Sequence, residues 1–215
     1  MHYLKRKRIG KDGSMAIKLD MSKAYDRVKW AFVENLLLCM GFSNRWVQLI
    51  KFCVSTVTYN VTHGGHTMDP INPGRGLRHG DPLSPYLFLI CAEGLYSLLK
   101  KYERHHWLIG CLVARRAPMV SHMLFVDDSY LYCKSNDREA QNVIHLLNSY
   151  ELASCQKVNF TNSSVFFSKN TSVDVQNRVC GFMGLREASE DSFYLGLPCI
   201  MGRNKNVILA FQTKK

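Results

Sequence analysis

Apolar residues recur at helical spacing in several segments of the chain. The pattern predicts helices over residues 28–40, 43–54, 84–102, 138–154 and 172–182, after a helix end at 2–9. Gly41 directly follows the first of these helices, where glycine suits a helix C-terminus, and Ser43 is placed to cap the next one. Ser84 and Pro85 occupy the expected N-cap and N1 positions of the long helix. That helix is apolar nearly all round at its start, so we expect it to be buried there.

Short β-like runs separate the helices. They cover residues 15–20, 57–63, 66–71, 119–124, 129–133 and 164–168, with an extended turn at 193–198. Gly64 and Gly65 divide the second run from the third, which predicts a hairpin. Strands and helices alternate without strict β-α-β regularity, so the predicted fold class is α+β.

Two adjacent acids, Asp127 and Asp128, lie between two apolar runs that only a tight turn can join. Taken alone, the pair is also good turn chemistry. A third acid, Asp20, ends the run over residues 15–20. If the two strands are neighbours, the three carboxylates converge at one edge of a sheet and form a Mg²⁺ site. A polymerase needs two such ions to activate a 3′-hydroxyl and to stabilise the leaving pyrophosphate.

Composition bounds the class of protein. The chain has 215 residues and is 47% hydrophobic, enough for one domain with a buried core. Its 28 Lys and Arg against 17 Asp and Glu give a charge of +11, which fits a polyanionic partner but also a merely soluble basic protein. No apolar run reaches the roughly 18 residues of a membrane span, and the basic N-terminus lacks the apolar stretch of a signal peptide. The eight cysteines include no Cys-x-x-Cys pair and indicate reduced core residues of an intracellular protein.

Residues 74–81 form a glycine-bearing loop, with Arg75 and Arg78, ahead of the long helix. Backbone amides, guanidinium groups and a helix N-terminus together bind phosphate well, although an ordinary glycine turn has the same composition. Tyr25 could stand beside the acidic site as an aromatic wall that clashes with a 2′-hydroxyl, or could be a core tyrosine. Asp26 is expected to form a local ion pair with Arg27 and to have no catalytic role.

Four segments resemble, in order, the palm motifs of reverse transcriptases, and best those of plant LINE-type, non-LTR retrotransposons. They are residues 19–28, 76–88, 125–128 and 194–203. The resemblance covers essentially the whole chain. It implies a right-hand polymerase palm, an RNA-recognition-like antiparallel sheet backed by helices, with RNA-directed DNA polymerase activity. The implied partners are an RNA template, a DNA primer and deoxynucleoside triphosphates, and the implied cofactor is Mg²⁺, as two ions.

The resemblance also implies roles for individual residues. The catalytic acids would be Asp20, Asp127 and Asp128, which would bind the metal with the carbonyl of Met21. The incoming nucleotide would be held by Met21, Ala24, Tyr25, His79 and Gly80, with Tyr25 as the sugar-discriminating aromatic. The nucleic acid would be contacted by Arg75 and Arg78, and by Tyr194, Gly196 and Arg203 in a primer-gripping turn.

Several positions depart from the family pattern. The family usually has Gln at His79 and Ala at Val126. It usually has Gly at Cys155, where a glycine would fit a turn that needs a positive φ. It usually has Lys at Asn162, a candidate for protonating pyrophosphate; whether Lys157 substitutes for it is left open.

The expected division of the chain is the end of a fingers segment (1–14), the palm (15–190), and a primer-grip-like turn with the start of a thumb (191–215). This looks like an excised palm from a truncated retroelement copy. One rival is a catalytically inactive nucleic-acid-binding remnant, which the departures support. Another is an RNA-dependent RNA polymerase, against which Tyr25 argues. Residues 5–8 resemble a nuclear targeting cluster, or alternatively a basic helix end on template phosphates, so an intracellular and nuclear location is a further expectation.

Overall fold

The computed structural model describes residues 2–10, 12–114, 116–125, 128–188, 193–194 and 197–198; for His2, Phe125, Asp128 and the last four it describes the backbone alone. The helices are α1 (His2–Arg6), α2 (Trp30–Cys39), α3 (Asn44–Ser55), α4 (Ser84–Arg104), α5 (Asp137–Ser154) and α6 (Val173–Met183). The longer strands are β1 (Ser14–Leu19), β7 (His122–Phe125), β8 (Asp128–Lys134) and β10 (Ser164–Phe167). Two-residue strands are β2 (Met21–Ser22), β3 (Thr62–His63), β4 (His66–Thr67), β5 (Cys111–Leu112), β6 (Met119–Val120), β9 (Lys157–Val158), β11 (Arg186–Glu187), β12 (Phe193–Tyr194) and β13 (Leu197–Pro198).

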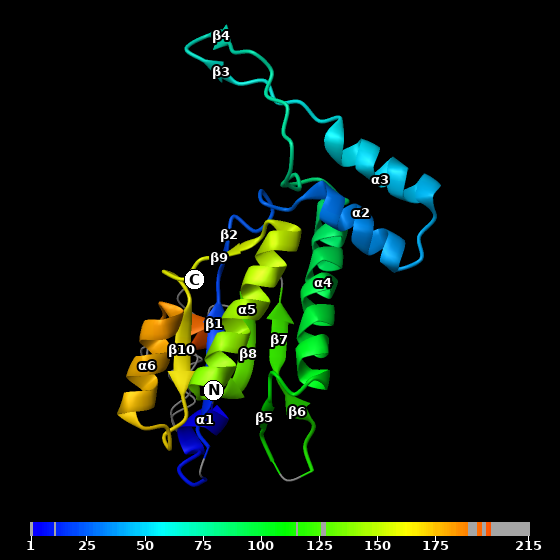
Figure 1. Cartoon of the computed structure of the whole chain (residues 1–215). Helices are drawn as coiled ribbons and strands as arrows, with labels where there is room; N and C mark the ends of the chain where they lie inside the picture. Colours follow the sequence, from blue (N-terminus) through cyan, green and yellow to red (C-terminus); the bar gives the residue numbers. More distant parts are fainter. Residues whose placement is uncertain are drawn as a thin grey trace.

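A five-stranded sheet in the order β11-β10-β1-β8-β7 forms the centre of the molecule (Figure 1). β1 pairs antiparallel with both β8 and β10, so that Ile17 lies opposite Leu131 on one side and Val165 on the other. β7 and β8 form the predicted hairpin, while β11 joins β10 in parallel. The central position of β1 explains its almost complete burial.

The two faces of the sheet follow the alternation of β1. Met15, Ile17 and Leu19 belong to the main core, where they meet the apolar side chains of α4, α5 and α6. Ala16 belongs to a smaller cluster with Leu4 of α1 on the other face. Helices therefore cover one face of the sheet as a layer, which is the α+β arrangement that the sequence predicted.

A second core lies beyond the end of the sheet, where α2 and α3 pack against the first half of α4. Val33 and Leu37 of α2, Val47 of α3, and Leu87 and Cys91 of α4 are buried there together. The β3–β4 hairpin projects away from this region (Figure 1). Leu77, in the loop between the hairpin and α4, is part of this second core.

The helices and the glycine hairpin confirm the sequence pattern, with corrections at three places. The predicted strands over residues 57–63 and 66–71 are reduced to β3 and β4, with an isolated bridge between Tyr59 and Ile71. Ser84 was predicted as an N-cap but is the first residue of α4; Leu83 precedes it as the cap, and the Asp81 carboxylate accepts from the Leu83 amide at 2.8 Å. The predicted strand 119–124 is divided at Ser121 into β6 and β7. The buried Ser121 hydroxyl bonds to Glu103 of α4, which anchors that break.

Candidate active site

The acidic site is set up by the register of β1 and β8. The last registered pair of the two strands is Leu19 opposite Ser129. Asp20 is the residue that follows Leu19, and Asp128 is the residue that precedes Ser129, so their backbones are adjacent at the same end of neighbouring strands. The expectation that these strands are neighbours is thereby confirmed. Asp127 and Val126 lie outside the described residues.

Asp20 is held by the segment that leads into β10. Its amide donates to the Ser163 hydroxyl at 3.0 Å, and its carbonyl accepts from the Asn159 amide at 2.8 Å. The side-chain amide of Asn162 donates to Asp20 Oδ2 at 3.3 Å. A neutral amide fixes the carboxylate without neutralising it, so its charge stays available to a cation.

The donor chemistry at this edge fits a hard divalent ion. Asp20 is half-buried at the end of a rigid central strand, and carboxylate oxygens are the ligands that Mg²⁺ prefers. Within the side chains that the structure describes, no three His, Cys, Asp or Glu residues gather as a metal site. The side chains of Asp127 and Asp128 lie outside that set, and they are the remaining predicted ligands.

Met21 and Ala24 lie in the short connection that follows Asp20. Contacts with the segment after α5 fix this connection. Met21 pairs with Val158 between β2 and β9. The carbonyl of Ala24 accepts from Gln156 Nε2 at 3.1 Å, and Gln156 is only 3% exposed. Gln156 Oε1 accepts a hydrogen bond from the hydroxyl of Tyr150. Sequence reasoning missed Gln156, because a glutamine beside Lys157 just after a helix end gives no local signal of burial.

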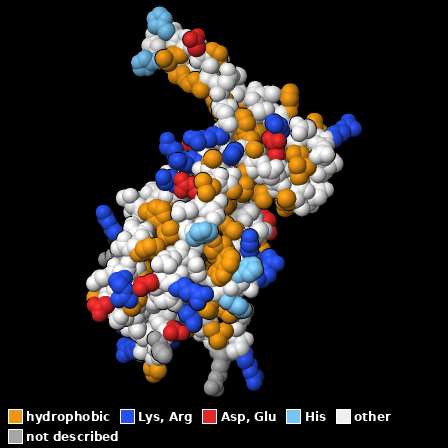
Figure 2. All heavy atoms as spheres, in the orientation of Figure 1, with side chains coloured by type: hydrophobic (Ala, Val, Ile, Leu, Met, Phe, Trp, Pro, Cys, Tyr) orange, Lys and Arg blue, Asp and Glu red, His pale blue; other side chains and the backbone are white. Residues whose placement is uncertain are grey.

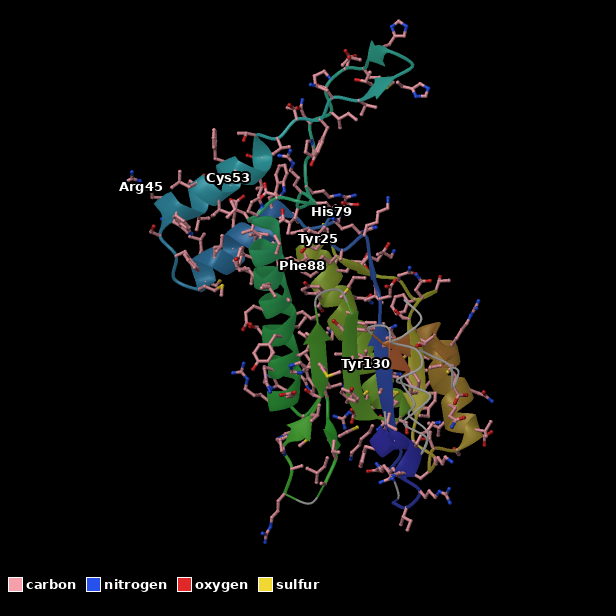
Figure 3. The ribbon with its side chains drawn as sticks, turned by 180° about the vertical axis from the view of Figure 1, so that it is seen from behind. Tyr25, Arg45, Cys53, His79, Phe88 and Tyr130 are labelled. Carbon is pink, nitrogen blue, oxygen red and sulfur yellow. The ribbon has the colours of Figure 1, made fainter. Side chains whose placement is uncertain are left out.

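Tyr25 stands between two other rings. It stacks on Phe88 of α4 with centroids 4.7 Å apart and planes 5° from parallel, and on His79 at 5.1 Å and 29°. Figure 3 shows His79, Tyr25 and Phe88 one above another at the N-terminal end of α4. The structure therefore brings two of the predicted nucleotide-binding residues into contact, and it adds Phe88, which the sequence did not single out.

The glycine loop is locked onto the Tyr25 segment. The Leu77 amide donates to the Tyr25 carbonyl at 2.8 Å, and Trp30 Nε1 donates to the Gly76 carbonyl at 2.7 Å. Gly76 has φ +97°, and a Cβ there would come within 2.8 Å of the Asp26 carbonyl oxygen. Only glycine fits this approach.

Arg75 and Arg78 lie on the rim of a pocket of about 280 Å³. Trp30 and Tyr59 contribute aromatic walls, and both arginines are exposed. Figure 2 shows Lys and Arg side chains gathered below the β3–β4 hairpin, with acidic side chains beside them. Cationic and aromatic groups together suit the binding of a nucleic acid, while the acids that line this pocket are Asp26 and Asp81.

The predicted ion pair between Asp26 and Arg27 is wrong. Asp26 Oδ1 lies 3.4 Å from His79 Nε2 instead. The Arg27 Nε is buried, and the part of the chain that the structure describes offers it no hydrogen-bond partner. The side chains of Asp26 and Arg27 thus have different surroundings, although the two residues are adjacent in the sequence.

The remaining predicted residues are placed as follows. Gly80 has φ +81° in the loop before α4. Lys157 is turned toward Glu151, with 3.8 Å between Nζ and Oε1. Tyr194 pairs through its backbone with Leu197 in the expected extended turn. The Tyr194 side chain, Gly196 and Arg203 lie outside the described residues.

Cys155 ends α5 with φ +62°, in the left-handed region. The sequence comparison with the family predicted a turn of this kind there. Of the other cysteines, Cys91, Cys111 and Cys133 are buried and free, as the sequence indicated. The prediction of a core position is wrong for Cys39 and Cys53, which are free but exposed on α2 and α3. None of the described helices is long and apolar enough to cross a membrane.

The fold and this arrangement agree with comparisons to known proteins. Residues 3–197 match the family model described as reverse transcriptase (RNA-dependent DNA polymerase), and the chain belongs to that family. As a family, reverse transcriptases depend on divalent metal ions. The match confirms the resemblance on which the motif assignments rest.

Curated relatives narrow the kind of reverse transcriptase. The chain is 30% identical over 98 residues to the Pol polyprotein of a type-1 R2 retrotransposable element of Popillia japonica, covering 46% of the chain and 16% of that protein. It is 46% identical over 59 residues to an uncharacterized mitochondrial protein of Arabidopsis thaliana, covering 27% of the chain and 48% of that protein. The first supports a LINE-type element, and the plant origin stays a prediction. The chain thus spans less than half the length of either relative.

Solved structures agree on the fold. Telomerase from Candida tropicalis, truncated from its C-terminal domain, superposes with a TM-score of 0.59 at 17% identity, over 91% of the chain and 35% of that protein. The same enzyme in complex with a fragment of telomeric RNA gives 0.60 at 15% identity, over 92% of the chain and 30% of that protein. At this identity the likeness confirms the polymerase palm fold.

Proposed function

We propose that this chain is the palm of an RNA-directed DNA polymerase, which extends a DNA primer on an RNA template with deoxynucleoside triphosphates. The observation that carries the proposal is the register of β1 and β8, which brings Asp20 and Asp128 to the same edge of the sheet. Membership of the reverse transcriptase family supports the reaction type.

Asp20, Asp127 and Asp128, with the carbonyl of Met21, are the proposed ligands of two Mg²⁺ ions. Bound there, the ions would supply the charge that activates the primer hydroxyl and stabilises the pyrophosphate. The chain's own part is to hold Asp20 rigidly, which it does through Ser163 and Asn162. Preorganised ligands cost no rearrangement at the moment of reaction.

The nucleotide site extends from these acids along the Tyr25 connection. Ala24 and Gly80 would offer backbone groups, while the Tyr25 ring would lie beside the sugar of the incoming nucleotide. A ring in that place excludes a 2′-hydroxyl and so favours deoxyribonucleotides over ribonucleotides. This argues for a reverse transcriptase and against an RNA polymerase.

The nucleic acid is proposed to lie across the basic rim. Arg75 and Arg78 would hold template or primer phosphates, and the segment with Tyr194, Gly196 and Arg203 would grip the primer end. Phosphate contacts position the duplex without reading its sequence.

The decisive test is primer extension on an RNA template with Mg²⁺. Asp127→Asn should abolish extension, because it removes a charge and a hard ligand. Asp174→Asn is the matched control, since Asp174 is an exposed acid in the first turn of α6, and should extend as the wild type does. Extension by purified Asp127→Asn protein would contradict the assignment.

A second candidate function is binding without catalysis. It is favoured by the contacts of Asn162 and Lys157, because an amide bound to Asp20 and a lysine turned toward Glu151 leave neither of these two described residues as an evident acid for the pyrophosphate. Under this alternative the wild-type chain binds an RNA–DNA hybrid but does not extend its primer at any Mg²⁺ concentration.

A further inference from the structure

The Tyr25 ring is supported very differently on its two faces. Phe88, on one side, is 4% exposed and belongs to the second core, so it is a fixed platform. His79, on the other side, has a side chain that is 76% exposed and lies in the glycine loop. A ring in such a loop needs a further contact to stay over Tyr25.

Asp26 supplies that contact. Its carboxylate oxygen lies 3.4 Å from His79 Nε2, and its side chain is 55% exposed. Because Asp26 directly follows Tyr25, the ring and the carboxylate are carried by adjacent residues and meet the same imidazole. The contact therefore ties the position of His79 to the position of Tyr25.

The backbone of this unit is fixed. The backbone carbonyl oxygen of Asp26 lies close to Gly76, and the Leu77 amide donates to the Tyr25 carbonyl. The loop that carries His79 therefore cannot slide along the Tyr25 segment. The remaining freedom lies in the side chains of Tyr25, Asp26 and His79, which is the freedom that the stack and the contact between Asp26 and His79 restrict.

We propose that Asp26 and His79 are positioning residues that hold Tyr25 against Phe88, and that they thereby set the discrimination between deoxyribo- and ribonucleotides. The proposal rests on the proposed function, in which Tyr25 faces the sugar. If His79 leaves the stack, Tyr25 loses the contact on one face and gains room to rotate away from the 2′-hydroxyl. Ribonucleotides should then be accepted more readily.

The size of the effect follows from the strength of a stacked ring pair, which corresponds to a factor of roughly 2 to 10 in an equilibrium. A purely structural role would instead lower the incorporation of both nucleotides alike. The ratio of kcat/KM for deoxyribonucleotides to kcat/KM for ribonucleotides therefore separates positioning from general damage.

The experiment compares wild-type protein with Asp26→Asn, His79→Ala and Tyr25→Ala in single-nucleotide incorporation on an RNA template. The matched control is Asp137→Asn. It breaks the ion pair of Asp137 with Arg178, which has a similar length of 3.3 Å and similar exposure of 57% and 56%, at the start of α5. We expect the selectivity to fall in the first three variants and to remain at the wild-type value in the control.

A second measurement does not depend on catalysis. The ring protons of His79 should be displaced in the NMR spectrum by the ring current of Tyr25, and His79→Ala identifies their signal by its loss. Asp26→Asn should move that signal toward its position in Tyr25→Ala, while Asp137→Asn should leave it in place. An unmoved signal in Asp26→Asn would overturn the positioning role.

The two measurements separate the two proposals. Incorporation of neither nucleotide by the wild type would contradict the proposed function, and the resonance would still decide whether Asp26 holds His79 on Tyr25. Normal selectivity in an active Asp26→Asn variant would overturn the inference and leave the polymerase assignment intact.

Discussion

Cys155 illustrates a cost that a single residue imposes on the fold. It adopts φ +62° at the C-terminus of α5, where a Cβ is disfavoured and glycine is not. Cys155→Gly should therefore raise stability by up to about 1 kcal/mol, or roughly 2–4 °C in Tm. Cys155→Ala is the control, because it keeps the Cβ and the strain. Thermal unfolding checks both, and an equal gain in the alanine variant would show that the backbone conformation is not the cause.

Glu139 makes stability depend on pH. It is 4% exposed, and burial raises the pKa of its carboxyl although the amides of Ile109 and Lys134 oppose the shift. A carboxyl with a raised folded-state pKa destabilises the native state above that pKa, and the penalty disappears as the pH falls through it.

Glu139→Gln removes this titration and keeps an oxygen for both amides. The Tm of Glu139→Gln minus that of the wild type should therefore increase as the pH rises from about 4, the ordinary range of glutamate, to neutrality. Thermal scans across that interval measure the difference, in which the other titrating groups cancel. A difference that stays constant or decreases with pH would contradict the assignment.

At the scale of residues, the sequence predicted those features that depend only on neighbouring positions in the chain. The positive φ at Cys155 followed from the glycine that the family has there. The contact of Asp26 with His79 did not follow, because these residues are far apart in the chain and Arg27 is the adjacent cation. Which acidic and basic side chains meet depends on which loops the tertiary fold brings together.

At the scale of elements, the end of α5 is tied to the nucleotide site by a buried network. The Tyr150 hydroxyl shares its one proton between Gln156 Oε1 and the more distant Cys91 carbonyl, and Gln156 donates to the Ala24 carbonyl. Gln156→Leu should cost about 2–3 kcal/mol, because it removes the donor to the Ala24 carbonyl and the nearer acceptor of the buried Tyr150 hydroxyl. This corresponds to a loss of roughly 5–10 °C in Tm.

A double-mutant cycle tests whether these residues act together. Tyr150→Phe combined with Gln156→Leu should destabilise the protein by less than the sum of the two single variants, because each single change already breaks their shared hydrogen bond. Thermal or denaturant unfolding gives the four values. Additive losses would show that the hydroxyl and the amide do not interact.

Element positions were largely predictable, and their ends were less so. The apolar period of α4 is visible in the sequence, but its first residue depends on Asp81, which bonds the Leu83 amide and moves the start of the helix. Likewise, residues 119–124 have a continuous β-like pattern. The break at Ser121 arises from Glu103 of α4, a partner that lies on another element.

At the scale of the whole molecule, the motif order was enough to predict a palm. The sheet order follows from that resemblance rather than from any strand taken alone, since β1, β8 and β10 are separated by long stretches of chain. The second core of α2, α3 and α4 was not predicted. Helix periodicity shows which face of a helix is apolar, but not which neighbour covers it.

The excess of positive charge should make nucleic-acid binding strongly salt-dependent even if catalysis is lost. Each neutralised phosphate releases counterions, so the affinity for an RNA–DNA hybrid should fall steeply with salt and depend little on sequence. Arg75→Ala with Arg78→Ala should weaken binding and reduce the slope of log K against log salt by up to about 2. Arg138→Ala with Arg186→Ala removes the same charge from exposed positions in α5 and β11 and is the matched control. Equal slopes in the two double variants would show that the rim below the β3–β4 hairpin is not the nucleic-acid face.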